Sequence, residues 1–302
     1  MTADRPLLGI LLMLGFCVMA PLGDALAKII GQTIPLGILL LARFAMQALL
    51  LLPLIALTNR PFRLEGRILR LAWLRTLLHI IGIAAMFTAL QYLPLADAVA
   101  IAFVMPFLML LLGHYVLGEE IGARRIIACA VGFIGTLLVI QPAFENVGWP
   151  ALLPLVVAVV FSLFMLVTRQ IAKQTDPISL QGVNGVMAVA ILLPILSIFS
   201  QTDIALFEIK APNLSELGML IAIGVIGTLA HLLMTWSLRY APSATLAPMQ
   251  YLEIPFATFI GWLVFSELPN TLASVGIAIT ISAGLYIVIR ERAMSRIAPQ
   301  VP

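Results

Sequence analysis

Glu253 is an acidic residue in the middle of a long apolar stretch, 243–266, with Gln250 one helical turn before it. On insertion scales an ionisable side chain at the centre of a bilayer costs roughly 2.5–3.5 kcal/mol, so such residues mark candidate functional sites. Glu253 either binds a cationic group of a substrate or a proton, or it is the structural partner of an Arg or His on a neighbouring helix. Glu253 and Gln250 are candidate substrate-binding residues.

Asp24 and Arg43 lie in the first two apolar stretches, 7–27 and 34–57. Opposite charges on neighbouring membrane helices can pair with each other, which would make these two residues a structural clamp. The alternative is that Asp24 guards the outer mouth of a binding site. Both residues are therefore candidates for substrate binding.

Two histidines share a predicted helix face with other polar residues. Arg75 precedes His79 by one turn, and Thr228, His231 and Thr235 occur at i, i+3 and i+7. A buried histidine is commonly a satisfied core residue, but both of these lie at membrane depth beside polar neighbours. We treat His79 and His231 as candidate site residues.

Aromatic residues in the apolar stretches could stack on a planar substrate or simply pack between helices. Tyr251, Trp236 and Phe103 are the candidates that we assign to a binding site, and Phe161 is a further one. Aromatic rings suit a substrate that is flat and amphipathic, whereas nothing in their spacing indicates a cofactor.

The composition indicates whether the protein that contains these residues is surrounded by water or by lipid. Of the 302 residues, 62% are hydrophobic and only 10% are charged, and the mean hydropathy is +1.11. A soluble domain carries about 25% charged residues because its surface meets water. The sequence therefore predicts an all-α integral membrane protein. The net charge of +3 is expected on cytoplasmic loops, so we expect no nucleic-acid partner.

A helix needs about 20 apolar residues to cross the hydrocarbon core. That length predicts ten transmembrane helices with short loops and no separate soluble domain. The first stretch resembles a signal peptide because Ala25-Leu26-Ala27 follows it, but we expect it to stay as the first helix. The ten predicted spans are 7–27, 34–57, 71–90, 94–116, 124–141, 149–170, 178–199, 215–238, 243–266 and 270–290.

Positive residues orient these spans, because cytoplasmic loops of membrane proteins carry an excess of Lys and Arg. With the N-terminus inside, the outer loops hold only Lys28 and Lys210, and Arg43 and Arg75 lie within spans. The other Lys and Arg residues all fall on the inner side. Both termini are predicted to face the cytoplasm of a bacterial-type cell, with the chain in the inner membrane. The inner positive residues are Arg5, Arg60, Arg63, Arg67, Arg70, Arg124, Arg125, Arg169, Lys173, Arg239, Arg290, Arg292 and Arg296.

The chain repeats itself at an offset of 148 residues. Tyr92-Leu-Pro matches Tyr240-Ala-Pro, Glu119 matches Glu267, and a one-residue slip pairs Pro106 with Pro255. This predicts two five-helix repeats, residues 1–146 and 147–302. Because five is odd, the second repeat enters the membrane from the opposite side, which is the inverted arrangement of many secondary transporters. The two prolines lie in mid-span and predict either hinges or tolerated kinks.

These segments resemble the drug/metabolite transporters of the ten-helix, EamA-type group. The resemblance covers almost all of residues 7–290. Its second copy ends in Phe-Ser-Glu where the family usually has Gly-Glu, which makes the two ends of the cavity unequal. The motifs that carry the resemblance are LARF (41–44), YLPLADAVAIAFVMPFLMLLLGHYVLGEE (92–120) and YAPSATLAPMQYLEIPFATFIGWLVFSE (240–267).

The resemblance implies a secondary carrier with a central cavity. Its walls would come mainly from the first, third, fourth, sixth, eighth and ninth spans, with the second span outside. Substrates of the family include amino acids, vitamins such as riboflavin, nucleotide-related compounds such as S-adenosylmethionine, and drugs. The family resemblance therefore leaves the substrate open.

We expect a transporter that moves a small polar or amphipathic metabolite by alternating access, rather than an enzyme. No G-x-S-x-G, H-E-x-x-H or Walker A motif occurs in the sequence. An intramembrane enzyme and a passive pore are the alternatives. We expect no cofactor and no metal, since Cys17 and Cys129 both lie in apolar runs. The predicted partners are a small-molecule substrate and the lipid bilayer, with proton coupling left open, in a monomer or a homodimer.

Overall fold

Twelve α-helices and two short 3-10 helices make up residues 5–118, 123–202 and 204–297, which are the residues that this computed structural model describes. In the first half these are α1 (Pro6–Ile30), α2 (Leu36–Leu57), α3 (Gly66–Ala89), α4 (Leu95–Ala102), α5 (Met105–Leu117) and α6 (Ala123–Val147). In the second half they are η1 (Trp149–Leu152), α7 (Leu153–Ala172), α8 (Pro177–Phe199), η2 (Ala205–Phe207), α9 (Leu214–Tyr240), α10 (Ser243–Gln250), α11 (Glu253–Phe265) and α12 (Thr271–Ile297).

These helices form the ten predicted spans. Eight segments are long and apolar enough to cross a membrane, and the shorter apolar helices Glu253–Phe265 and Thr271–Ala283 supply the other two. The prediction of an all-α, multi-pass membrane protein with ten spans is confirmed. Most span boundaries agree with the predicted ones to within about three residues, because hydropathy and turn residues both act locally. The exceptions are α3, which begins earlier than predicted, and α6 and α12, which end later.

Several helices begin where the sequence offers a side-chain cap. The Asp176 carboxylate accepts a hydrogen bond from the Ser179 amide at the start of α8. Asn213 and Glu216 form a reciprocal capping box at the start of α9. Such caps satisfy backbone amides that have no partner inside the helix. The loops can therefore stay short, and the spans are tied closely together.

The fourth and ninth spans differ from the continuous helices that we predicted. Each is broken into two helices, α4 and α5 in the fourth span and α10 and α11 in the ninth. Pro106 lies in the first turn of α5, and Pro255 is the third residue of α11. Proline has no backbone N–H and disfavours helical geometry in the residue before it, so each helix restarts at its proline. The prolines therefore mark breaks rather than kinks.

Both second half-helices end in the same left-handed turn. The residue that caps the end of the helix is Gly118 (φ 69°) after α5 and Ser266 (φ 55°) after α11. Their amides bond to the carbonyls of His114 and Trp262, which are also 148 residues apart. The backbone turn is therefore the same with serine at position 266 as with glycine at position 118, although a left-handed serine destabilises the fold by about 1 kcal/mol. Glu119, the predicted counterpart of Glu267, lies outside the described residues.

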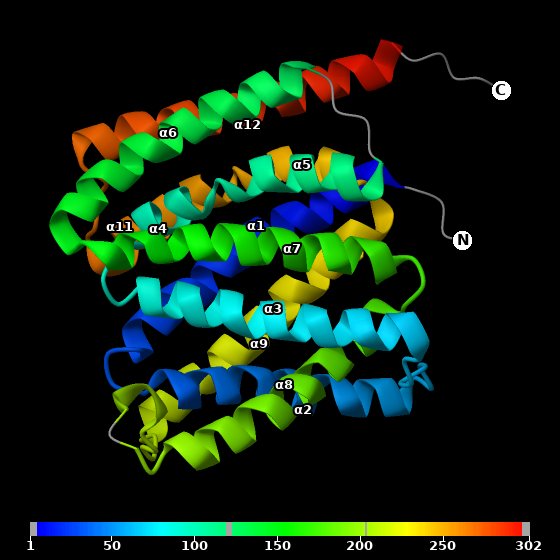
Figure 1. Cartoon of the computed structure of the whole chain (residues 1–302), viewed down its shortest axis with the longest axis vertical. Coiled ribbons are helices and arrows are strands. Elements are labelled where there is room, and N and C mark those ends of the chain that lie inside the picture. Colours follow the sequence, from blue (N-terminus) through cyan, green and yellow to red (C-terminus); the bar gives the residue numbers. More distant parts are fainter. Residues whose placement is uncertain (1–4, 119–122, 203, 298–302) are drawn as a thin grey trace.

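Contacts between the repeats come in matched pairs. Helix α1 packs against α9 as α7 packs against α3, and α4 packs against α11 as α10 packs against α5. The equivalent spans α2 and α8 pair with each other, as do α6 and α12, and these two pairs lie at opposite edges of the bundle (Figure 1). Such a pattern is what a two-fold relation between inverted repeats produces.

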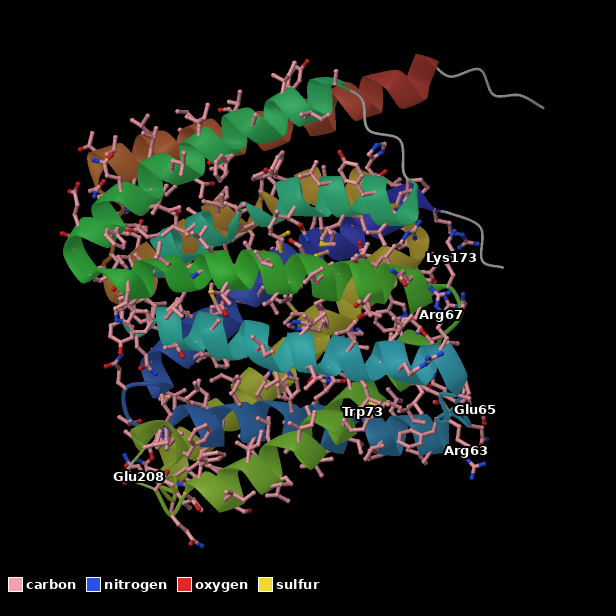
Figure 2. All side chains as sticks on the ribbon, in the orientation of Figure 1. Arg63, Glu65, Arg67, Trp73, Lys173 and Glu208 are labelled. Atoms are coloured by element: carbon pink, nitrogen blue, oxygen red, sulfur yellow. The ribbon has the colours of Figure 1, made fainter. Side chains whose placement is uncertain are left out.

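Charged loop residues gather at the ends of the bundle. Arg63, Glu65, Arg67 and Lys173 lie at one end, whereas Glu208 lies at the opposite end (Figure 2). The middle of the bundle is therefore the part that meets lipid on its outer surface.

Candidate functional site

A cavity lies between the two repeats. Its walls come from α1, α3, α4, α5, α7, α9 and α11, with Arg43 contributed by α2. The empty space within it measures about 800 Å³, which includes space open to the outside. The walls come from the spans that the family resemblance implied, except that the second span also takes part.

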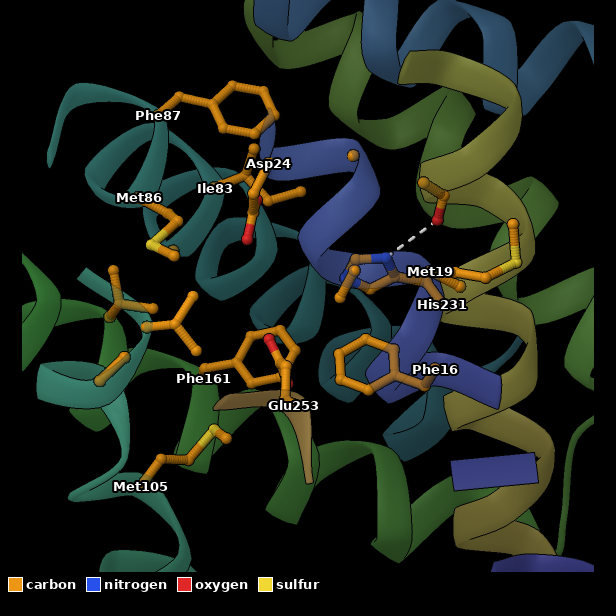
Figure 3. Close-up of a pocket in the computed structure, with 18 of the residues that line it drawn as sticks. Phe16, Met19, Asp24, Ile83, Met86, Phe87, Met105, Phe161, His231 and Glu253 are labelled. Atoms are coloured by element: carbon orange, nitrogen blue, oxygen red, sulfur yellow. Dashed lines mark hydrogen bonds between the residues drawn. The ribbon is translucent and has the colours of Figure 1, made fainter. Parts of the chain in front are cut away.

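Four ionisable side chains line this cavity. Asp24 and Arg43 come from the first repeat, and His231 and Glu253 come from the second. Figure 3 shows Asp24, His231 and Glu253 around one space. The sequence marked all four as candidates, and the fold brings them together from four different spans.

Glu253 reaches the cavity because the ninth span is broken. The break at Tyr251 and Leu252 makes Glu253 the first residue of α11, and its side chain is only 8% exposed. Within the described residues, no hydrogen bond or ion pair engages its carboxylate. The amides at a helix N-terminus carry a partial positive charge, which favours a carboxylate there. Glu253 is therefore held at the cavity wall without a protein cation as its partner.

Asp24 lies on α1 and is half-buried at the cavity wall. The predicted clamp with Arg43 does not form, since no ion pair joins these two among the described residues. The carboxyl groups of Asp24 and Glu253 instead line the same cavity, and Figure 3 shows them pointing toward one another. Two acidic groups thus share one space.

Arg43 has neutral partners. Its Nη1 donates to Gln47 Oε1 at 3.0 Å, and its Nη2 lies 3.2 Å from His231 Nδ1. The guanidinium fits because position 227 is glycine, where a Cβ atom would collide with it. Gly227 therefore makes the room in α9 that lets an arginine of α2 reach the cavity.

The rings of His79 and His231 contact each other in a tilted arrangement, with centroids 4.3 Å apart and an interplanar angle of 43°. Only His231 is among the lining residues. Its Nδ1 also lies 2.9 Å from the Gly227 carbonyl (Figure 3), so this nitrogen either donates to Gly227 or accepts from Arg43. Its buried Nε2 has no hydrogen-bond partner among the described residues. His79 lies outside the cavity lining, and its Nδ1 is 3.4 Å from Asn184 Oδ1.

Aromatic rings and thioethers make up much of the remaining wall. Phe16 and Phe161 stack with centroids 6.3 Å apart and an interplanar angle of 17°. Phe103 also lines the cavity, together with Met19, Met86 and Met105. Figure 3 shows Phe16 and Phe161 on either side of the Glu253 carboxyl group. A flat apolar group would find two parallel ring faces there.

Besides His79, three further candidate residues lie outside the cavity wall. Gln250 is fully buried on α10, where its Nε2 lies 3.1 Å from Met165 Sδ. Tyr251 is 2% exposed, and its ring contacts Phe103 with centroids 5.4 Å apart. Trp236 packs against an apolar cluster formed by Leu51, Ile55, Ile178 and Leu232. Direct roles for these three in substrate binding stay predictions, and their positions favour support of the wall.

A second group of buried polar residues lies toward the end of the bundle that carries Arg63 and Lys173. At its centre is Arg75, which is 0% exposed and donates to Thr168 Oγ1 at 2.8 Å and Asn184 Oδ1 at 2.6 Å. Thr235 Oγ1 lies 3.4 Å from its third nitrogen. The guanidinium carbon also lies 4.5 Å from the centre of the Phe164 ring, where a cation–π attraction operates.

This polar cluster extends toward the cavity through two glutamines. Gln47 Nε2 donates to the Gln181 carbonyl at 2.7 Å, and Gln181 Nε2 donates to the His231 carbonyl at 2.9 Å. We define the polar cluster as Gln47, Arg75, His79, Thr168, Gln181, Asn184 and Thr235. Sequence reasoning did not identify Gln47, Thr168, Gln181 or Asn184. The spacing of Gln181 and Asn184, three residues apart on one helix face, was a usable signal.

An ion pair joins the two repeats at the end of the bundle near Glu208. Lys28 Nζ lies 2.7 Å from Glu267 Oε1, and it also donates to the Leu93 carbonyl at 2.9 Å. The Leu95 amide donates to the same carboxylate at 3.3 Å. These contacts connect the C-terminal end of α1 with the loop before α4 and with the end of α11. Sequence reasoning counted Lys28 only as a loop charge.

Comparisons with known proteins identify the kind of molecule in which this cavity occurs. The model of the EamA-like transporter family matches residues 7–141 and 148–290, one copy for each repeat. A solved crystal structure has the same fold, with a TM-score of 0.66 over 96% of this chain and 98% of that one at 16% identity.

Three relatives of known function are similar over most of their length. A riboflavin transporter of Rhizobium johnstonii is 28% identical over 74% of this chain and 71% of its own. An S-adenosylmethionine uptake transporter of Rickettsia felis is 26% identical over 90% of both chains. A pseudopaline exporter of Pseudomonas aeruginosa is 28% identical over 96% of this chain and 95% of its own. All three are transporters, and none is an enzyme.

Proposed function

The chain belongs to the EamA-like transporter family, and we propose that it is a secondary carrier that moves a small polar or amphipathic organic metabolite across a bacterial inner membrane by alternating access. Transport of small metabolites is common to its relatives. The proposal concerns the mechanism, the membrane and the chemical nature of the substrate.

The observation that carries this proposal is the cavity between two inverted repeats. Its ionisable lining residues come from both repeats. The side toward Arg63 is filled by the polar cluster, whereas the cavity itself contains space. In an alternating-access carrier, packed side chains close the substrate cavity on one side of the membrane while it is open to the other side. Inverted repeats can exchange the closed and the open side during the cycle.

The relatives leave the substrate and the direction open. One is named for riboflavin, one for uptake of S-adenosylmethionine and one for export of pseudopaline. We therefore propose uptake experiments with purified protein in liposomes, using radiolabelled riboflavin, S-adenosylmethionine and a mixture of amino acids. Each compound is tested with and without an imposed pH gradient, because proton coupling is part of the question.

The expected result is accumulation of at least one compound above the level of protein-free liposomes, with saturation as its concentration rises. Saturation indicates a binding site that alternates, whereas a pore passes substrate in proportion to concentration. Linear, non-saturating passage of all compounds would favour the passive pore. Absence of transport for every compound tested, extended to the metabolites of a whole-cell extract, would count against a carrier.

The excess of Lys and Arg at one end supports cytoplasmic termini. Single cysteines introduced as Arg63→Cys, Lys173→Cys and Glu208→Cys, in a chain without Cys17 and Cys129, test this orientation with a membrane-impermeant maleimide. In sealed cells only the variant at position 208 should be labelled. Labelling at position 63 or 173 would reverse the orientation.

A further inference from the structure

Asp24 and Glu253 are two carboxyl groups that share one cavity wall without a protein cation between them. Arg43 is the one cation among the described lining residues, and it is engaged by Gln47 and His231. The acidic groups of the lining therefore outnumber its cationic group by two to one. A cavity of this kind attracts positive charge.

The surroundings make that imbalance costly. Glu253 is 8% exposed and Asp24 lines the same space, so two ionised carboxylates here would repel each other. In a medium of low dielectric constant both the loss of water and the repulsion are much larger than in water. A cationic group placed between the two carboxylates would reduce both costs at once, because it gives each oxygen pair a charged hydrogen-bond partner.

A third observation points to a ligand at this place. His231 is 8% exposed, lines the cavity, and has a buried Nε2 without a hydrogen-bond partner among the described residues. Buried polar atoms in native proteins are almost always bonded to protein, water or ligand. The unpartnered nitrogen and the two carboxyl groups all border the same space (Figure 3).

The shape of the wall defines the rest of the molecule. Phe16 and Phe161 present stacked rings on either side of Glu253 (Figure 3). Ring faces attract both flat apolar groups and cations. A small inorganic cation would leave most of this apolar wall uncovered, and no group of three metal-binding side chains occurs within the described residues.

We propose that the substrate of this carrier combines a cationic nitrogen group, which binds between Asp24 and Glu253, with a flat aromatic part that lies against Phe16 and Phe161. This inference rests on the transport function proposed above and specifies the chemical class of its substrate. Uncharged and purely anionic aromatic compounds are excluded by the same lining.

A set of matched indole compounds separates these classes in a binding experiment. Tryptamine carries the cation alone, L-tryptophan carries a cation and a carboxylate, and indole-3-propionate carries only the carboxylate. Thermal unfolding of the purified full-length protein in detergent micelles is measured with each compound at millimolar concentration. Riboflavin serves as an uncharged aromatic probe, and sodium chloride at constant ionic strength serves as the inorganic probe.

Tryptamine and L-tryptophan are expected to raise Tm by about 2–4 °C, as a ligand that binds only the folded state does. Indole-3-propionate, riboflavin and sodium chloride should leave Tm unchanged. The shift should be lost in Glu253→Gln and in Asp24→Asn, so that failure of one variant to fold still leaves the other. Glu145→Gln is the matched control, because Glu145 is an exposed residue of α6 whose carboxylate accepts a hydrogen bond from Gln141; it should keep the full shift.

The proposal is overturned if indole-3-propionate, riboflavin or sodium stabilises the protein as well as the amines do. It is equally overturned if neither amine produces a shift, or if the shift persists in both acidic variants. Uptake in liposomes is a separate measurement. Saturable transport of an uncharged or anionic compound would leave the carrier function in place and remove this substrate class, whereas loss of all transport would remove the function itself.

Discussion

The cavity and the polar cluster both contain ionisable residues in the middle of a membrane protein, but these residues differ in how many partners the protein gives them. In the cluster, Arg75 donates to two side-chain oxygens and lies over the ring of Phe164. In the cavity, Asp24 and Glu253 have no ion-pair partner among the described residues, and space lies beside them. A charge that the fold surrounds with partners is a structural element, whereas a charge left beside space is available to a ligand.

The cavity and the polar cluster also occupy different parts of the bundle. The cluster fills the half toward Arg63 and Lys173, where α3, α7, α8 and α9 are held together by side-chain hydrogen bonds. The cavity occupies the region beyond it, and His231 belongs to both because its carbonyl accepts from Gln181 while its ring lines the cavity. In an alternating cycle the cluster would have to loosen when the cavity closes. The following predictions test whether the two regions are as different as their contacts indicate.

The largest effect on stability is expected for Arg75→Met. It removes the 2.6 Å hydrogen bond to Asn184 Oδ1 and one donor from Thr168 and Thr235, which keep their other hydrogen bonds. A buried polar group without a partner costs about 1–3 kcal/mol. We expect a loss of about 2–4 kcal/mol in the free energy of unfolding, measured in detergent micelles. Arg67→Met on the same helix is the control, since Arg67 makes an exposed hydrogen bond to Gln170 and should change stability little. Unfolding of both variants at the wild-type midpoint would show that the cluster is not structural.

Glu253→Gln should affect transport rather than stability. The substitution keeps the shape of the side chain and removes its charge, so we expect unfolding to change by less than about 0.5 kcal/mol. Uptake in liposomes should fall about tenfold or more, or should no longer respond to a pH gradient. If Glu253 were half of a structural ion pair, stability would instead fall by about 3–5 kcal/mol. A folded variant with wild-type uptake at every pH would remove Glu253 from the site, and Glu145→Gln on α6 again serves as the control.

The smallest effect is expected at the ion pair between Lys28 and Glu267. Its side chains are 13% and 30% exposed, so water screens the pair more than it screens the buried groups. A double-mutant cycle with Lys28→Met and Glu267→Gln should give a coupling energy of about 0.2–1 kcal/mol. A coupling of several kcal/mol would mean that this contact is as important to the fold as the polar cluster, and the contrast between the regions would need revision.

The candidate site could be predicted only in part. Glu253, Asp24, Arg43 and His231 were recognisable as charges or histidines in apolar stretches, because the cost of burying them does not depend on the fold. Their grouping in one cavity was implied by the family resemblance for three of the four. Arg43 was expected outside, because a single sequence does not reveal that Gly227 on α9 leaves room for its guanidinium.

The partners of these residues were the least predictable feature. Asp24 was assigned to Arg43 because their charges are opposite and their depths similar, yet Arg43 bonds to Gln47 and approaches His231, 188 residues away. Lys28 and Glu267 lie 239 residues apart. Side-chain pairing depends on distances of a few tenths of an ångström, and hydropathy carries no information at that scale.

The sequence was enough to specify ten spans, the opposite orientation of the two five-helix halves and the presence of acidic residues at membrane depth. The signals were hydropathy, the charges of the loops and the 148-residue repeat. These features follow from the cost of transferring each residue into lipid, which is a property of residue type and local order. The breaks that make α5 and α11 separate helices, the distinction between a filled and an open half, and the choice of which charges receive partners depend on packing between distant segments. Only the folded bundle brings Glu253 opposite Asp24 and surrounds Arg75 with oxygen atoms, because both arrangements arise from contacts between helices rather than within them.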